Sequence, residues 1–295
     1  MGKVPLLICC LSYKMHSTYL LRMFNDCVAI LFMNLCILFS LKNKWGLSVV
    51  LYSVALSIKM NILLYLPGLL LVINWTYNYV ATLSTVLFVV GFQLLIALPF
   101  LQTNPSGYFK MAFDFSRVFD QKESAYWQFI PESTFTSKPF HNLLLVLHVL
   151  FLLIFLWRKA VYGFSIKSKL RSLNLPTSLS DFISPKQGVS QKPEHIAYVL
   201  FFTHFIGIFF SRSFHIQYYT WYIYTLPFLL CYKQRSLWKI GLFLLLEIAY
   251  VQYPPKLYSS VMVFALHLAF LAMFDRMFDK VTPDVFRVEG VKKGR

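Results

Sequence analysis

Charged side chains are scarce in this chain. Only 14% of its 295 residues are Asp, Glu, Lys or Arg, whereas 58% are hydrophobic, and the mean hydropathy is +0.59. One soluble core cannot bury that much apolar surface, so the composition excludes an ordinary soluble domain. We therefore expect an all-α polytopic membrane protein.

Motifs for metals and nucleotides are also lacking. The five cysteines have no CxxC spacing and mostly fall in apolar runs, which argues against a zinc site and against a disulfide framework. The chain has no HExxH, no GxxxxGK[ST], no GxGxxG, and no DxD pair that would hold a metal on a nucleotide diphosphate. We expect no metal site and no cofactor.

Acidic residues are few, and the net charge is +16. The Lys and Arg residues cluster between apolar runs instead of covering one soluble face, so membrane topology explains them better than nucleic-acid binding does. We expect no nucleic-acid partner.

Apolar runs divide the chain into ten candidate membrane segments. Lys59 and Asn61 interrupt the run 46–73, and a charge at the bilayer centre costs about 2.5–3.5 kcal/mol, so two short helices are expected there. The segments are 4–20, 27–41, 46–58, 61–73, 80–101, 141–157, 195–211, 218–232, 238–253 and 257–274.

The distribution of basic residues gives an independent test of this topology. With ten crossings and Lys3 in the cytosol, 19 of the 28 Lys and Arg residues fall in cytosolic segments, as the positive-inside rule requires. The predicted organisation is a transmembrane domain over 1–274 and a cytosolic tail over 275–295. Within the domain, 102–140 forms a loop on the far side and 158–193 a basic cytosolic loop.

The same topology brings three cations from distant segments, Arg22, Lys59 and Arg212, to the far rim. A cation inside a membrane-embedded segment is costly, so three at one rim indicate a shared anionic ligand such as a lipid phosphate. The alternative is that each side chain reaches separately toward lipid headgroups.

Aromatic residues that suit a sugar lie in two parts of the chain, after Arg212 and in the 102–140 loop. Tyr218 and Trp221 follow Arg212, and Trp127 lies in the 102–140 loop. Flat amphipathic rings suit the apolar face of a sugar, although an interfacial aromatic belt would have the same composition. A phosphate site beside such rings predicts a polyprenyl-phosphate sugar as the ligand.

Four stretches carry a resemblance to a known family. They are "SYKMHSTYLLRMFND", "LSIKMNILLYLPGLL", "NPSGYFKMAFDFSRVF" with the following "WQFIPE", and "GIFFSRSFHIQYYTWYIYTLPFLL". The chain resembles the dolichyl-phosphate-mannose-dependent α-1,3-mannosyltransferases of the endoplasmic reticulum. The resemblance implies a GT-C-like bundle of about ten transmembrane helices, a lumenal 102–140 loop and a lumenal active site. It also implies mannose transfer from dolichyl phosphate mannose to the five-mannose lipid-linked precursor of N-glycans.

The resemblance has one departure. Enzymes of this kind carry a catalytic aspartate in the first lumenal loop, and this chain begins downstream of that point, so an N-terminally shortened form is expected. Asp26 is the only carboxylate in the first 100 residues. The general base is therefore unknown, with Asp26 or Glu132 as a fallback.

The resemblance and the residues together predict two sets of site residues. The donor phosphate is expected to contact Arg22, Lys59 and Arg212. Sugar or lipid-phosphate contacts are expected from Asn25, Asn61, Asp114, Arg117, Trp127, His215, Gln217, Tyr218 and Trp221. Asp114 and Arg117 alternatively pair with each other.

Partners and location follow from the same resemblance. The expected partners are dolichyl phosphate mannose, the lipid-linked oligosaccharide acceptor and membrane lipids. The terminal "KKGR" is similar to a dilysine retrieval signal, which implies a multi-pass protein of the endoplasmic reticulum membrane with a cytosolic C-terminus. The alternatives are a catalytically inert form that binds the lipid-linked substrate or assembles with partners, and a mannosyltransferase of glycosylphosphatidylinositol synthesis.

Overall fold

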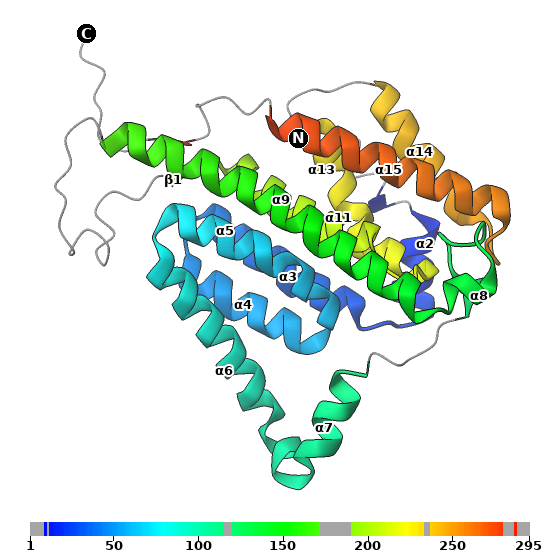
Figure 1. Ribbon diagram of the computed structural model, residues 1–295, viewed down its shortest axis with the longest axis horizontal. Helices are drawn as coiled ribbons and strands as arrows, with labels where there is room; N and C mark the ends of the chain where they lie inside the picture. The colour runs from blue at the N-terminus through cyan, green and yellow to red at the C-terminus, as the bar shows by residue number, and fades with distance from the viewer. Residues whose placement is uncertain are drawn as a thin grey trace.

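The computed structural model describes residues 9–10, 12–114, 120–171, 190–232, 237–279 and 286–287, and it is an all-α membrane protein (Figure 1). Two strands of two residues each are the exception among the described elements. In chain order the elements are α2 (Tyr13–His16), the π-helix η1 (Ser17–Leu21), α3 (Asp26–Leu41), α4 (Trp45–Ile58), η2 (Met60–Tyr65), α5 (Leu66–Thr76), α6 (Tyr79–Thr103), α7 (Pro105–Ala112), η3 (Gln121–Glu123), α8 (Glu132–Phe135), α9 (Lys138–Arg171), β1 (Ser190–Gln191), α11 (Pro193–Phe209), η4 (Ile216–Tyr218), α12 (Tyr219–Tyr222), η5 (Ile223–Thr225), α13 (Leu226–Cys231), α14 (Leu237–Val251), α15 (Leu257–Asp279) and β2 (Phe286–Arg287).

Three described helices are long and apolar enough to cross a membrane by themselves. They are α6, the 138–158 part of α9, and the 257–277 part of α15; a fourth span forms if the bent pair 13–21 and 26–41 is counted as one. Helices α4 and α11 and the η2–α5 segment are apolar but shorter. The described helices therefore establish a multi-pass protein, while the number of ten crossings stays a prediction.

Helix α11 lies at the centre of the bundle. Fourteen of its 17 residues are buried, and it packs against α3, α5, α9 and α15. A helix that is apolar on all sides is expected to be surrounded by other elements. Helices α5 and α11 approach closely at Gly68. A Cβ on Gly68 would lie 2.4 Å from Thr203 Oγ1, so only glycine fits there. This buried helix fixes the position of the loop that follows it.

The helix break predicted inside 46–73 is confirmed. Helix α4 ends at Ile58, Lys59 is extended with φ −148° and ψ 125°, and η2 begins at Met60. A second break separates η1 from α3, where Met23 has φ 51°. Both breaks place polar residues at helix ends and not within a continuous apolar helix.

Strands β1 and β2 join two distant parts of the chain at one end of the molecule. They pair antiparallel, with Ser190 opposite Arg287. Arg158 Nη1 of α9 also donates to Asp275 Oδ2 of α15 at 2.9 Å. Paired strands lie on the same side of the membrane, so an even number of spans has to separate β1 from β2. The predicted topology also has an even number there, and the pairing is compatible with it. The rest of the basic loop over 172–189 and most of the tail lie outside the described residues.

Candidate functional site

Three interruptions in the helices supply the candidate site. The first is the turn between η1 and α3, where the chain bends by 112°. The second is the extended residue Lys59, and the third is the loop between α11 and η4. Irregular backbone inside a membrane protein is tolerated where it is buried in protein or lines a cavity, and such places commonly hold ligand sites. Each of the three predicted phosphate-binding residues, Arg22, Lys59 and Arg212, lies at one of these breaks.

Asp26 is at the centre of this region. It occupies the first turn of α3 and is 1% exposed. One carboxylate oxygen, Oδ2, lies 3.1 Å from Lys59 Nζ, and the other, Oδ1, accepts a hydrogen bond from Trp221 Nε1. The helix N-terminus also favours a negative charge at this position. Asp26 therefore joins the first two breaks directly, and through Trp221 it contacts α12, which follows the third break after η4.

Lys59 is positioned to bind a further anion. Its Nζ donates to Asp26 and also to Asn25 Oδ1, 3.4 Å away, and its side chain is 27% exposed. An ammonium group has three N–H donors, so one donor is left beyond these two contacts. A lysine held by a buried carboxylate and still partly open can bind a phosphate oxygen.

Aromatic rings continue the site from Asp26 toward the loop after α11. Tyr218 stacks on Trp221 with ring centroids 3.9 Å apart and an interplanar angle of 20°. His215 lies edge-on to Tyr218 at 6.1 Å. Tyr218 is half-buried, so part of this surface is open. Such rings can pack against the apolar face of a sugar.

The predicted 102–140 loop docks on the segment that follows α11. The Ala125 amide donates to the Phe214 carbonyl at 2.7 Å, and Trp127 Nε1 donates to the Ser211 carbonyl at 3.4 Å. Tyr126 stacks on Phe214 at 4.1 Å, and burial raises the pKa of Tyr126 well above its usual range. Its phenol therefore stays neutral and serves as packing. Trp127 therefore lies beside the segment after α11, and its contact with a sugar stays a prediction.

A side-chain contact reinforces this docking. His215 Nδ1 lies 3.3 Å from Glu123 Oε2, and the Glu123 side chain is 55% exposed. Ser124 and His215 also form an isolated β-bridge. His215 is thus held between the loop and the aromatic rings.

The two arginines have different electrostatic neighbours. Arg22 is exposed in the turn before α3, close enough to Lys14 to interact electrostatically. Arg212 is half-buried in the loop after α11 and close enough to His141 of α9 to do the same. The described contacts therefore join Lys59 to Asp26, whereas convergence of Arg22, Lys59 and Arg212 on one phosphate stays a prediction.

The remaining predicted residues are distributed around these contacts. Asn61 lies in η2, and its buried Oδ1 has no hydrogen-bond partner among the residues that the structure describes. Gln217 is half-buried in η4, and its carbonyl accepts from Thr220 Oγ1 at 2.8 Å. Asp114 follows α7 and Glu132 begins α8, and both are exposed. Arg117 lies outside the described residues.

Glu247 is a site residue that the sequence analysis missed. It lies in α14, where it accepts from Tyr219 of α12, and Ser12 Oγ donates to its other oxygen at 3.4 Å. The hydroxyl oxygens of Ser12 and Tyr219 are themselves 3.0 Å apart. A single acidic residue within the apolar run 241–251 is the signal that would have identified it, because intramembrane carboxylates are costly unless they have a role.

The arrangement favours binding of an anionic, sugar-bearing lipid. The site combines the partly open Lys59, the buried Asp26 and the stacked rings of Tyr218 and Trp221. These groups lie near the ends of broken helices, where the surrounding protein can accommodate polar side chains. Among the described ranges, no group of three or more His, Cys, Asp and Glu residues is arranged to hold a metal ion.

The chain is similar to known proteins over most of its length. A sequence profile of the family described as ALG3 protein matches residues 1–260. The Dol-P-Man:Man(5)GlcNAc(2)-PP-Dol alpha-1,3-mannosyltransferase of Arabidopsis thaliana is 38% identical over 270 residues, which are 89% of this chain and 61% of that protein. The enzyme of the same name from Homo sapiens is 37% identical over 272 residues, 90% of this chain and 60% of that protein.

A relative from Dictyostelium discoideum matches nearly the whole chain. This probable Dol-P-Man:Man(5)GlcNAc(2)-PP-Dol alpha-1,3-mannosyltransferase is 35% identical over 300 residues, 99% of this chain and 65% of that protein. The chain thus spans about three fifths of the length of the curated relatives it matches. No solved structure matches it significantly.

Proposed function

Because the chain belongs to the ALG3 protein family, we propose that it transfers mannose from dolichyl phosphate mannose, in α-1,3 linkage, to Man5GlcNAc2-PP-dolichol. The names of the relatives specify this donor, this acceptor and this linkage. The observation that carries the proposal from the relatives to this chain is the contact of Asp26 with Lys59 and Trp221. It places a cation and an aromatic ring, the two groups needed for a phosphosugar, around one buried carboxylate.

Lys59 binds the donor phosphate in this proposal. Dolichyl phosphate is the leaving group, so negative charge grows on the phosphate as the mannose leaves, and a preorganised cation stabilises that charge. Asp26 holds the ammonium in place through Oδ2, at 3.1 Å. Arg22 and Arg212 supply further positive charge to the phosphate in this proposal.

The stacked rings of Tyr218 and Trp221 bind the mannose. The two rings stack face to face at 3.9 Å, so the half-buried Tyr218 offers its outer face to the sugar while the buried Trp221 supports it from behind, next to Asp26. Asn25 accepts a hydrogen bond from Lys59 at 3.4 Å, Asn61 follows Lys59 by two residues, and His215 and Gln217 precede Tyr218 in the chain. These four side chains provide hydrogen bonds to sugar hydroxyls or to phosphate oxygens.

We place the reaction on the lumenal side of the endoplasmic reticulum membrane, with the C-terminus in the cytosol. The positive-inside rule supports this orientation, because the predicted topology puts 19 of the 28 Lys and Arg residues in cytosolic segments. The pairing of Ser190 with Arg287 supports a common side of the membrane for these two residues.

The test is a transfer assay with the full chain. Cells deficient in this α-1,3-mannosyltransferase would express the chain, and their lipid-linked oligosaccharides would be separated by size. We expect conversion of the five-mannose to the six-mannose species. Lys59→Met should reduce the initial rate about 100-fold, because a preorganised cation on the leaving group is removed.

Two controls complete the assay. Lys42→Met removes an exposed lysine from the other end of α3 and should leave the rate unchanged. Lys59→Arg retains a cation and should restore part of the activity lost in Lys59→Met. Donor binding with no six-mannose product would support a binding role instead, and mannose transfer to a glycosylphosphatidylinositol precursor would overturn the proposed acceptor.

A further inference from the structure

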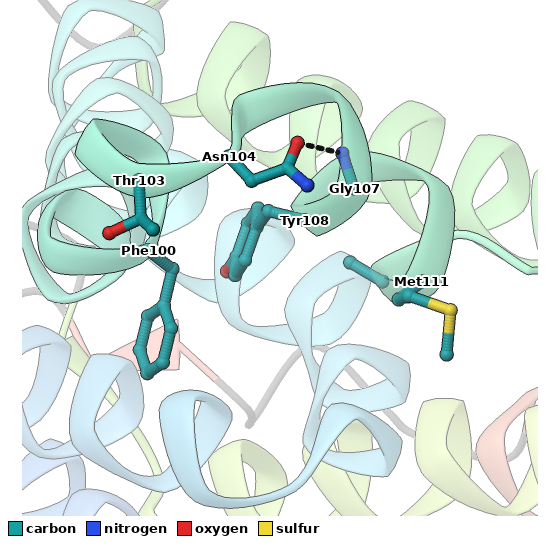
Figure 2. A pocket seen from close by; sticks show the side chains of 7 residues that line it. Phe100, Thr103, Asn104, Gly107, Tyr108 and Met111 are labelled. Atoms are coloured by element: carbon teal, nitrogen blue, oxygen red, sulfur yellow. Dashed lines mark hydrogen bonds between the residues drawn. The ribbon is translucent and has the colours of Figure 1, made fainter.

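Helices α6 and α7 form a hairpin that projects from the rest of the bundle (Figure 1). Helix α6 ends at Thr103, and Asn104 leaves the helical conformation with φ −151° and ψ 84°. Asn104 Oδ1 accepts from the Gly107 amide at 2.9 Å, and Pro105 occupies the first position of α7 (Figure 2). A side-chain cap and a proline at this position both begin a helix, so the sequence itself specifies the sharp turn.

The turn depends on glycine at position 107. A Cβ there would lie 2.6 Å from Asn104 Nδ2, which is too close for the amide to keep its place. The cap and the missing side chain therefore fix the geometry of α7 relative to α6.

A groove of about 670 Å³ lies between the two helices. Its lining is mainly apolar, and Figure 2 shows Phe100, Tyr108 and Met111 along it. The Phe100 and Tyr108 rings stack at 6.0 Å with an interplanar angle of 18°. The other lining residues are Thr103, Asn104, Gly107 and Ala112.

The groove continues a surface that faces lipid. Helix α6 is one of the three helices able to cross a membrane, and most of its apolar side chains are exposed. Phe100 at its end is 62% exposed, and Met111 of α7 is 76% exposed. An exposed apolar surface on a helix long enough to cross a membrane is expected to contact lipid, and the groove adjoins that surface at Phe100.

We propose that this groove binds an acyl chain of a bilayer phospholipid. The apolar lining suits hydrocarbon, and the groove is continuous with the lipid-facing surface of α6. Lys110, exposed in the last turn of α7, lies next to Met111 and can reach the headgroup phosphate while its methylene stem stays near the acyl region. Helix α7 is two turns long, too short to cross a bilayer, and acts as a lipid-binding edge at the end of α6.

Fluorescence quenching in phospholipid nanodiscs tests the proposal with the full chain. Cys10, Cys27 and Cys231 are replaced by serine, and bimane is attached to Met111→Cys or, as the control, to Ser106→Cys. Both positions are exposed on α7, but only Met111 lines the groove. With doxyl-labelled phosphatidylcholine, quenching at position 111 should be severalfold stronger than at position 106.

Filling the groove distinguishes a bound chain from general contact with lipid. Ala112→Phe should reduce the quenching at position 111 severalfold, whereas Ser106→Phe, on the other face of α7, should not. Equal quenching at both labelled positions would overturn the proposal. Cross-linking between Met111→Cys residues of two copies, or loss of quenching when dolichyl phosphate is added, would also overturn it in favour of a second copy or an isoprenoid chain.

Discussion

Two acid–base contacts at the same end of the molecule have similar lengths and very different surroundings. Lys59 and Asp26 are 3.1 Å apart, and the Asp26 side chain is fully buried. His215 and Glu123 are 3.3 Å apart, and the Glu123 side chain is 55% exposed. Exposed pairs contribute little because water and salt screen them, whereas removal of one member of a buried pair leaves an uncompensated charge. Burial, and not distance, therefore ranks these two contacts.

The two contacts also differ in how many other bonds support the same elements. Asp26 uses both oxygens, one on Lys59 and one on Trp221, so the start of α3, the break at Lys59 and helix α12 are joined by one carboxylate. The His215–Glu123 pair lies beside a backbone hydrogen bond from Ala125 to Phe214, which holds the loop without it. Loss of the first contact should affect the whole site, and loss of the second should be partly compensated.

The largest effect is expected for Asp26→Ala. This substitution leaves the Trp221 indole N–H buried without an acceptor, which costs about 1–3 kcal/mol, and it releases Lys59. Mannose transfer should fall about 100-fold or more because the preorganised cation is lost. The measurements are the initial rate of transfer and the midpoint of thermal unfolding by fluorescence-detected size exclusion.

Asp26→Asn sharpens this prediction. Asparagine retains an acceptor for Trp221 but removes the negative charge that holds Lys59. Stability should therefore be close to that of the unsubstituted chain, while transfer remains strongly reduced. If Asp26→Asn transferred mannose at the normal rate, Asp26 would have a role in packing alone.

An intermediate effect is expected for Glu247→Ala. The substitution removes the acceptor of Tyr219, a fully buried residue of the four-residue helix α12. Such a short helix has little stability of its own, so amide exchange over 219–225 should increase and the unfolding midpoint should fall. Glu247→Gln retains an acceptor and should restore most of the protection. Hydrogen–deuterium exchange that is identical in both variants would show that Glu247 does not hold α12.

A helix break could be predicted from the sequence because a charged residue interrupts an apolar run that is long enough to cross the bilayer. Lys59 inside an apolar run was sufficient to place a break, which the structure has at that residue. The partners at the break could not be predicted, since Asp26 and Trp221 are 195 residues apart and their contact depends on how α3 and α12 pack around α11. Composition gives the cost of a buried charge but not the identity of its partner.

Two other features of the site show the same limit. Glu247 was overlooked because its partners Ser12 and Tyr219 are ordinary polar residues with no motif. The docking of the 102–140 loop through Ala125 and Phe214 uses backbone groups, which carry no sequence signal at all. The prediction that Arg22 and Arg212 share a phosphate with Lys59 rests on charge alone, and the described hydrogen bonds of Lys59 are with Asn25 and Asp26.

The smallest effect is expected for Glu123→Ala. The exposed carboxylate contributes at most about 1 kcal/mol to the free energy of unfolding, and raised salt should weaken that contribution further. A double-mutant cycle with His215→Gln, measured by thermal unfolding at low and high ionic strength, isolates the interaction between the two side chains. Because the Ala125–Phe214 hydrogen bond remains, transfer in Glu123→Ala should stay close to normal. A loss of transfer as large as that of Asp26→Ala would mean that the exposed contact, and not the backbone bond, positions His215 for the sugar.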